Sequence, residues 1–221
     1  MTWSILARDP ATGELGVAVA TRFFAVGAIC PRAEGGVGAI ATQALVNPLL
    51  AIDGMARLRG GEAPAEALAA LLAADAGRDH RQLHVLAADG RIAQHTGAAC
   101  IDWCGHVAGP DVSVAGNMLA GPQVVLATRD AWLARAGLPM AERLIAALEA
   151  GEAAGGDRVA GNRRRSRWRA ATPTPISTCG WTTMPTRWPN CAGCMRWRRS
   201  TTSPSAGSWP GATIPACSTG R

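Results

Sequence analysis

The sequence predicts an α+β fold in which antiparallel strands form sheets and pairs of helices cover them. Two stretches of the chain, residues 2–22 and 82–96, show a strand–turn–strand pattern. Two others, residues 47–72 and 122–151, carry apolar side chains at helical spacing, and each is long enough for two helices. Because an amphipathic helix must bury its apolar face, we expect one helix pair on each of two sheets.

The first hairpin opens the chain. Residues 2–8 and 13–22 are predicted as two short strands, and residues 9–13 between them contain Pro and Gly where turns favour these residues. The strands are apolar on both faces instead of alternating between apolar and polar side chains. This pattern is typical of strands that are covered on both sides.

Thr2 follows the initiator Met directly. Met before a small residue is usually removed after synthesis, so we expect Met1 to be absent from the mature protein. The α-amine of Thr2 would then have an ordinary pKa of about 8 and could take the proton of the neighbouring hydroxyl. Thr2 is therefore a candidate nucleophile, although many proteins that begin with Met-Thr use the Thr for nothing of this kind.

A third strand is predicted at residues 37–45, after two glycines that interrupt the chain. Thr42 and Gln43 are the polar residues of this apolar segment, and in a buried strand they need hydrogen-bond partners. Two interpretations stay open for them. They bond to a neighbouring loop, or they line a pocket beside Thr2.

Four helices are predicted from capping and breaking residues. Each begins at a proline, which suits the first turn of a helix, and glycines end three of them. The prolines are Pro48, Pro64, Pro122 and Pro139. In the first of these helices, Asn47 is the expected N-cap, and Leu49, Ile52 and Ala56 form the expected apolar stripe.

The second hairpin is predicted at residues 82–87 and 91–96, with Asp-Gly in the turn between them. His84 lies inside its first strand, and we interpret it as a hydrogen-bonded structural residue. His95 lies near the end of the second strand, where a structural role and a role in a pocket both stay open.

Asn117 follows a short predicted strand at residues 112–115 and stands between Gly and Met. An Asn in this setting can be a turn residue in the left-handed region of the backbone. Its side-chain amide can also donate a hydrogen bond to a developing oxyanion. Both interpretations stay open.

Cysteine and histidine spacing does not predict a metal centre. Cys100, Cys104 and His106 lie close together, but their spacing fits none of the common structural zinc patterns. Cys191 and Cys194 form a Cys-x-x-Cys without a second pair at a useful spacing, which favours chance. We expect no metal and no cofactor, and we expect the cysteines to be free thiols.

Four separated motifs resemble the family called Domain of Unknown Function 1028 (DUF1028). The motifs lie at residues 2–20, 38–44, 95–106 and 116–121, and the resemblance extends over about residues 2–158. The family is placed in the N-terminal-nucleophile hydrolase superfamily. The resemblance therefore implies a four-layer αββα sandwich, in which two stacked antiparallel sheets lie between helical layers, and it points to amide hydrolysis.

The hypothesis of an amide hydrolase gives roles to five residues. Thr2 would attack an amide carbonyl while its own amine takes the proton, and Asn117 or a backbone N–H would hold the oxyanion. Arg22, Gln43 and His95 would line the pocket and bind the substrate, with Arg22 suited to a carboxylate. The expected partner is a small amide or peptide-like substrate. The chain has no Lys with which to tune the amine.

Charge and hydropathy set the expected compartment and partners. The net charge of +6 divides into −5 for residues 1–157, with 11 Arg against 16 acidic residues, and +11 for residues 158–221. The sequence has no run of 18 apolar residues and no leader pattern at its start. We expect a cytoplasmic protein without a membrane partner, and a homo-oligomer is compatible with this composition.

The composition changes abruptly after Asp157. Residues 158–221 contain no Leu, Asp, Glu or Lys, and five of the eight Trp. We interpret residues 1–157 as an incomplete hydrolase-like domain and residues 158–221 as a frame-shifted, disordered tail, so we expect this copy to be poorly folded and inactive. Codons read two bases later permit a strand followed by an amphipathic helix.

Two alternatives to an active hydrolase follow from the same sequence. The chain could be a catalytically silent member of the same fold. The alternating Arg and Trp of residues 163–169 could instead bind nucleic acid. We rank nucleic-acid binding below the hydrolase and expect no nucleic-acid partner.

Overall fold

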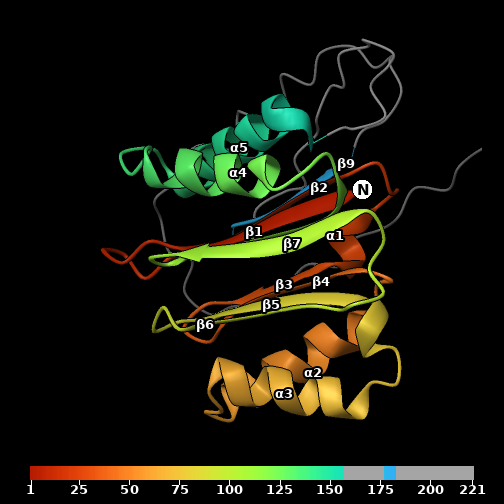
Figure 1. The fold of residues 1–221 in the computed structure, drawn as a ribbon. Coiled ribbons are helices and arrows are strands. Elements are labelled where there is room, and N and C mark those ends of the chain that lie inside the picture. The colour runs from red at the N-terminus through yellow and green to blue at the C-terminus, as the bar shows by residue number, and fades with distance from the viewer. Residues whose placement is uncertain (157–176, 183–221) are drawn as a thin grey trace, which may run out of the picture. The chain divides into compact units, whose positions relative to one another are not determined.

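Two β-sheets face each other, and helices lie on the outer side of each (Figure 1). The structure is a computed structural model that describes residues 1–156 and 177–182. The first sheet has the strand order β7-β8-β1-β2-β9, and the second has the order β3-β4-β5-β6. The bounds in the first sheet are β1 Thr2–Arg8, β2 Leu15–Thr21, β7 Trp103–Gly109, β8 Val112–Leu119 and β9 Ser177–Thr182. Those in the second are β3 Pro31–Glu34, β4 Gly38–Ala44, β5 Arg81–Ala87 and β6 Ile92–Thr96.

Both predicted hairpins are confirmed. β1 pairs with β2 and β5 pairs with β6, each antiparallel. In the first turn, the amide of Gly13 donates to the carbonyl of Asp9 over 2.8 Å. Gly13 has φ of 72°, a left-handed conformation that glycine adopts without strain. β1 also pairs with β8, so the first strand of the chain lies in the interior of its sheet.

The four predicted helices are also confirmed. α2 (Pro48–Arg59) and α3 (Pro64–Ala74) cover the second sheet, and α4 (Gln123–Leu133) and α5 (Met140–Gly151) cover the first (Figure 1). Asn47 caps α2, because its side chain accepts a hydrogen bond of 3.2 Å from the amide of Leu49. α4 ends four residues before the predicted Gly137.

The predicted apolar stripe of α2 is wrong. Leu49 and Ile52 are 62% and 45% exposed, whereas Leu50, Met55 and Leu58 are buried. The reason is a close approach at Gly54, where an added Cβ would lie 2.6 Å from Cδ1 of Ile40 on β4. The face that carries Gly54 can come nearest to the sheet, and it determines which leucines are buried.

Several short elements were not predicted. α1 (Val26–Ile29) and β3 connect β2 to β4, η1 (Arg78–His80) precedes β5, and η2 (Glu152–Gly156) follows α5. β7 was not predicted as a strand, because its sequence contains two glycines and a single β-branched residue, Val107.

The part of the tail that the structure describes differs from our expectation. We expected residues 158–221 to be disordered, but Ser177–Thr182 forms β9, which pairs in parallel with β2 from Gly16 to Thr21. The free edge of β2 offers unpaired N–H and C=O groups, and backbone pairing of this kind requires no particular side chains. The predicted frame shift, the basic stretch at 163–169 and the Cys191/Cys194 pair lie outside the described residues.

Three apolar clusters hold the layers together. One lies under α4 and α5 and contains Trp3 and Ile5, and a second lies under α2 and α3. The third joins the two sheets and contains Leu6, Val17 and Leu86. Within the described residues, no helix combines the length and apolar character needed to cross a bilayer.

Candidate active site

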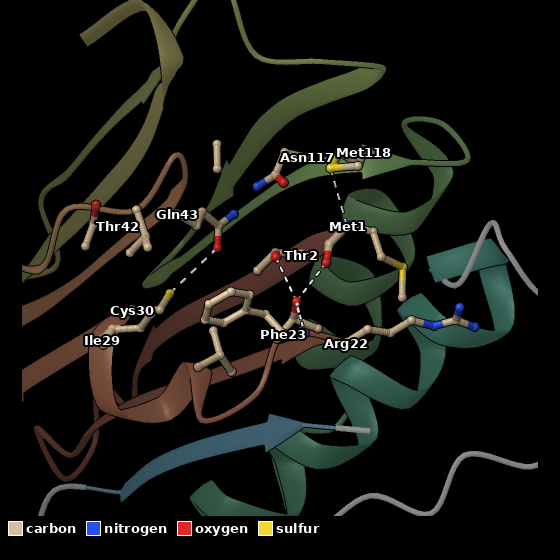
Figure 2. Close-up of a pocket in the computed structure, with 14 residues that line it drawn as sticks. Met1, Thr2, Arg22, Phe23, Ile29, Cys30, Thr42, Gln43, Asn117 and Met118 are labelled. Carbon is tan, nitrogen blue, oxygen red and sulfur yellow. Dashed lines mark hydrogen bonds between the residues drawn. The ribbon is translucent and has the colours of Figure 1, made fainter. Parts of the chain in front are cut away.

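A cavity of about 370 Å³ opens between the two sheets at the N-terminal end of β1 (Figure 2). Thr2 and Thr21 line it from the first sheet, and Gln43 lines it from the second. Asn117 lines it from β8. Three of the predicted site residues, Thr2, Gln43 and Asn117, are therefore brought together from three distant parts of the chain.

The sheet register fixes the neighbours of Thr2. Thr21 stands opposite Thr2 on one side and Asn117 on the other. The hydroxyl oxygens of Thr2 and Thr21 are 2.9 Å apart, and the Thr21 hydroxyl donates over 2.8 Å to the carbonyl of Met1. Because a hydroxyl has one proton, the Thr2 hydroxyl must be the donor in the bond between the two threonines.

Met1 lies directly in front of Thr2 and lines the same cavity. Its ammonium group donates to the sulfur of Met118 over 3.5 Å (Figure 2). While Met1 is present, the nitrogen of Thr2 belongs to a peptide bond and cannot accept a proton. The chain with Met1 therefore holds a candidate nucleophile without the base that would activate it.

Asn117 lies inside β8 and is not the turn residue that one interpretation made of it. The left-handed conformation belongs to the next residue, Met118, with φ of 57°. The Asn117 amide donates one hydrogen to Oε1 of Gln82 over 3.2 Å. Its second hydrogen and its Oδ1 have no partner among the described residues, and the group lines the cavity. It is free to donate to a ligand there.

Gln43 lines the cavity, but the amide group of its side chain already has hydrogen-bond partners within the protein. Its Nε2 donates to Oε1 of Gln82 over 2.7 Å and to the carbonyl of Ala115 over 3.1 Å. Its Oε1 accepts from the hydroxyl of Ser4 over 2.8 Å. Both amide hydrogens are used, so Gln43 shapes the cavity wall and offers no donor to a ligand. Thr42, the preceding residue, also lines the cavity, and its buried hydroxyl has no hydrogen-bond partner among the described residues.

Arg22 and His95 differ from the other predicted residues. Arg22 lines the cavity, but its guanidinium extends away from Thr2 (Figure 2). His95 is not brought to the cavity. It stands opposite Leu83, which packs against α2 and α3, so alternation along the strand turns it to the outer face of the second sheet. There its Nε2 bonds to the carbonyl of Arg78 over 3.0 Å.

Cys30 also lines the cavity, and it is a poor nucleophile. Burial raises the pKa of its thiol to about 12, which keeps it protonated at neutral pH. Its sulfur makes a long contact of 3.9 Å with Oε1 of Gln43. Among the described nucleophilic side chains of this cavity, Thr2 is thus the stronger candidate.

A buried polar network extends from the cavity into the space between the sheets. The prediction that His84 is a hydrogen-bonded structural residue is confirmed, since its two ring nitrogens lie 2.8 Å from the hydroxyls of Ser4 and Ser113. Ser4 donates its proton to Gln43, so Nε2 of His84 must carry the hydrogen that reaches Ser4. Burial lowers the pKa of His84 to about 3, which keeps the ring neutral.

The same network continues from Gln82 to the surface. Nε2 of Gln82 donates to Oγ1 of Thr96 over 2.8 Å, and Thr96 in turn bonds to Nδ1 of His106 over 2.9 Å. Burial, with a smaller contribution from His95, lowers the pKa of His106. Gln82 and Ser4 belong to the site although their sequence pattern did not lead us to predict it. The alternation of Gln82, His84 and Leu86 on one face of β5 was the available signal.

The cysteine and histidine cluster does not form a metal centre in the described part of the chain. No group of three or more His, Cys, Asp or Glu side chains there is arranged to hold an ion. The Cys104 thiol donates to the carbonyl of Cys100 over 3.7 Å, and His106 bonds to Thr96. Cys30, Cys100 and Cys104 are free thiols.

Comparisons with known proteins agree on one family. Residues 2–166 match the family model described as "Family of unknown function (DUF1028)". The fold is similar to the crystal structure of protein SPO2555 from Silicibacter pomeroyi, which is described with the same family. The two chains are 36% identical, with a TM-score of 0.67 over 70% of this chain and 68% of that one. No curated protein sequence matches this chain.

Proposed function

We propose that this chain, which belongs to the DUF1028 family, carries the site of an amide hydrolase whose nucleophile is an N-terminal threonine. The observation that carries the proposal is the place of Thr2. It is the first residue of an interior strand, its hydroxyl lines a cavity between two sheets, and Met1 stands directly before it. The layering of helices, two sheets and helices is compatible with an N-terminal-nucleophile hydrolase sandwich.

Removal of Met1 changes two groups at once. It converts the Thr2 nitrogen into an amine, and it takes away the carbonyl to which Thr21 donates. The Thr21 hydroxyl can then turn and donate to Oγ1 of Thr2, which lies 2.9 Å away. The amine is left to accept the Thr2 proton. The nucleophile and its base are thus completed by one cleavage.

The reaction would follow from these groups. Oγ1 of Thr2 bonds to the amide carbon while the α-amine takes its proton, and the amine then gives a proton to the leaving nitrogen as the C–N bond breaks. Water hydrolyses the resulting ester to release the acid. The second amide hydrogen of Asn117 would stabilise the developing oxyanion, with Gln82 holding the first.

A reactive probe tests this proposal without knowledge of the substrate. The mature chain is incubated with a β-lactone, which acylates nucleophilic hydroxyls, and its intact mass is measured. We expect the mature chain to lack Met1 and to gain one probe at Thr2. A chain that retains Met1 should not react, and Thr2→Ala should not react either. Ile52→Ala, on the exposed face of α2, is the matched control and should react like the wild type.

Two results would contradict the proposal. A mature chain that keeps Met1 has no base at Thr2. A processed chain that binds amides and neither reacts with the probe nor hydrolyses them is a catalytically silent member of the fold.

A second proposal concerns residues 158–221, which we propose are translated in a shifted reading frame. It is supported by the composition change after Asp157 and by the end of the family match at residue 166, close to that change. The described residues that line the cavity all precede residue 119. Sequencing of the DNA across codons 150–221 tests the proposal, and an unbroken frame would overturn it.

A further inference from the structure

A second cavity adjoins the first on the far side of Asn117. It measures about 280 Å³, and Leu45, His80, Cys100 and Ile101 contribute to its lining. Three residues line both cavities, namely Ala44, Asn117 and Met118. The two cavities are therefore adjacent at the side chain that we assign to the oxyanion. A substrate carbonyl held there has room on both sides.

On the basis of the function proposed above, we propose that the two cavities bind one class of ligand, an amide with uncharged, apolar groups on both sides of the bond that is broken. The acyl group lies in the first cavity and the amine component in the second. Neither the second cavity nor this division of the substrate follows from the family resemblance.

The charges of the lining disfavour a cationic ligand. Among the described residues that line either cavity, none is Asp or Glu, and Arg22 is the one Arg. The Arg22 guanidinium extends away from Thr2 (Figure 2). An ammonium group in either cavity would lose water without gaining a carboxylate partner, and this loss is costly. The lining thus selects against cationic substrates on both sides of the carbonyl.

Apolar side chains support a ligand that covers them. Phe23 in the first cavity, and Leu45 and Ile101 in the second, are each 60–62% exposed. Large apolar side chains that stand exposed together around a hollow are typical of ligand-binding surfaces. Burying them against an apolar ligand would release water and favour binding.

Met1 indicates which side of the substrate enters which cavity. Its carbonyl is held by Thr21 and its nitrogen contacts the sulfur of Met118, so its backbone leads from Thr2 to Met118. The leaving nitrogen must take a proton from the Thr2 amine, and it therefore occupies the path that Met1 vacates. Its substituent continues past Met118 into the second cavity. The acyl group stays bonded to Thr2 and lies in the first cavity.

The backbone at the junction is strained in a manner that fits a binding site. Ala44 and Met118 both have positive φ, 67° and 57°, which non-glycine residues adopt rarely. Such conformations tend to occur at functional sites, where the surrounding structure holds them. Both residues lie where the two cavities meet.

Three amides of equal length test the proposal. The parent is N-butylheptanamide. In the second amide an ammonium replaces the terminal methyl of the acyl chain, and in the third an ammonium replaces the terminal methyl of the butyl group. Binding to the Thr2→Ala variant is measured by calorimetry, and hydrolysis by the wild type is measured by mass spectrometry. We expect the parent to bind at least about tenfold more tightly than either cation.

Charge-rescue variants then test each cavity separately. Ile101→Glu should restore binding of the amide with the cationic amine component by about tenfold and leave the acyl-side cation unchanged. Phe23→Glu should restore binding of the acyl-side cation by about tenfold and leave the amide with the cationic amine component unchanged. Both positions are exposed, so the variants should fold. Leu126→Glu, on the exposed part of α4, is the matched control and should change neither.

The outcomes separate this inference from the proposed function. Equal binding of the three amides would overturn the ligand class, and rescue of the acyl-side cation by Ile101→Glu would overturn the assignment of the cavities. Selective binding without hydrolysis would remove Thr2 as nucleophile and leave the ligand class in place. Hydrolysis without selective binding would overturn the ligand class and leave Thr2 as the nucleophile.

Discussion

The space between the two sheets has an apolar end and a polar end. Along the inner face of β1, the chain passes from Thr2 through Ser4 to Leu6, and along β5 from Gln82 through His84 to Leu86. Apolar contact at one end joins the sheets without a preferred direction. Hydrogen bonds at the other end join them in one fixed arrangement. The cavity lies where this fixed arrangement meets solvent, which gives Asn117 a defined position before any ligand binds.

The largest effect is expected at the apolar end. Leu6→Ala removes a fully buried side chain from the cluster between the sheets and leaves a space that the neighbouring strands cannot fill. We expect a loss of about 2–5 kcal/mol in the free energy of unfolding, measured by urea denaturation. A loss below about 1 kcal/mol would show that apolar contact at this end contributes little to the stability of the fold. Probe labelling of Thr2 should persist in the fraction that remains folded.

At the polar end, Ser113→Ala should cost less stability than the apolar substitution. The Ser113 hydroxyl bonds to Nδ1 of His84 and accepts from Nε2 of Gln94 over 2.9 Å. The Ala variant leaves both nitrogens buried with one partner fewer, so we expect a loss of about 1–3 kcal/mol in urea denaturation. Ser113→Thr keeps a hydroxyl and is the matched comparison. Equal stability of wild type and Ser113→Ala would mean that the network contributes nothing.

Lowering the pH should reduce the free energy of unfolding through the polar end of the space between the sheets. The folded state holds the pKa of His84 near 3, whereas an unfolded His has a pKa of about 6.5. Between these values the unfolded chain binds the proton and the folded chain does not, so stability is present above pH 6.5 and falls as the pH is lowered. The slope is about 1.4 kcal/mol per pH unit, and His106 adds to it with the same sign.

The measurement is the free energy of unfolding between pH 6.5 and 5, above the range in which carboxylates titrate. His84→Gln should reduce the slope in this window. An unchanged slope in the variant would assign the pH dependence to other groups.

The smallest effect is expected outside both ends. Ile52→Ser changes an exposed position of α2 that the sequence had marked as part of its buried stripe. We expect a change within about 0.5 kcal/mol, measured by thermal unfolding. A loss above about 1.5 kcal/mol would indicate that Ile52 belongs to the buried apolar face, as the sequence predicted.

The sequence predicted where the helices and strands lie better than it predicted which face of each one is buried. Pro48 and Asn47 mark the start of α2 because capping is local chemistry, and the Asp-Gly turn marks the second hairpin for the same reason. The buried face of α2 depends on how closely Gly54 approaches Ile40, which is a property of two distant segments. The helical spacing of apolar residues along α2 is compatible with burial of either face.

The candidate site was predicted in part for a similar reason. Thr2, Gln43 and Asn117 were identified by motif, and the structure brings them to one cavity. His95 was assigned to the pocket by the same kind of evidence, but the face on which a strand residue lies depends on register, which one sequence does not fix. Gln82 was missed because its importance lies in contacts with β4 and β8, far away in the chain.

The interior position of β1 has a consequence for the order in which the chain is made. β1 and β2 leave the ribosome first, but the strand that pairs with the other edge of β1 begins at Val112, 91 positions after Thr21. At synthesis rates of about 5–20 residues per second, the hairpin waits about 5–18 s with that edge unpaired. Met1 contacts Met118, which belongs to the late strand, so we expect the start of the chain to be more open to an aminopeptidase during this interval than afterwards, when Met1 is half-buried. We therefore expect Met1 to be removed most readily while the chain is being made.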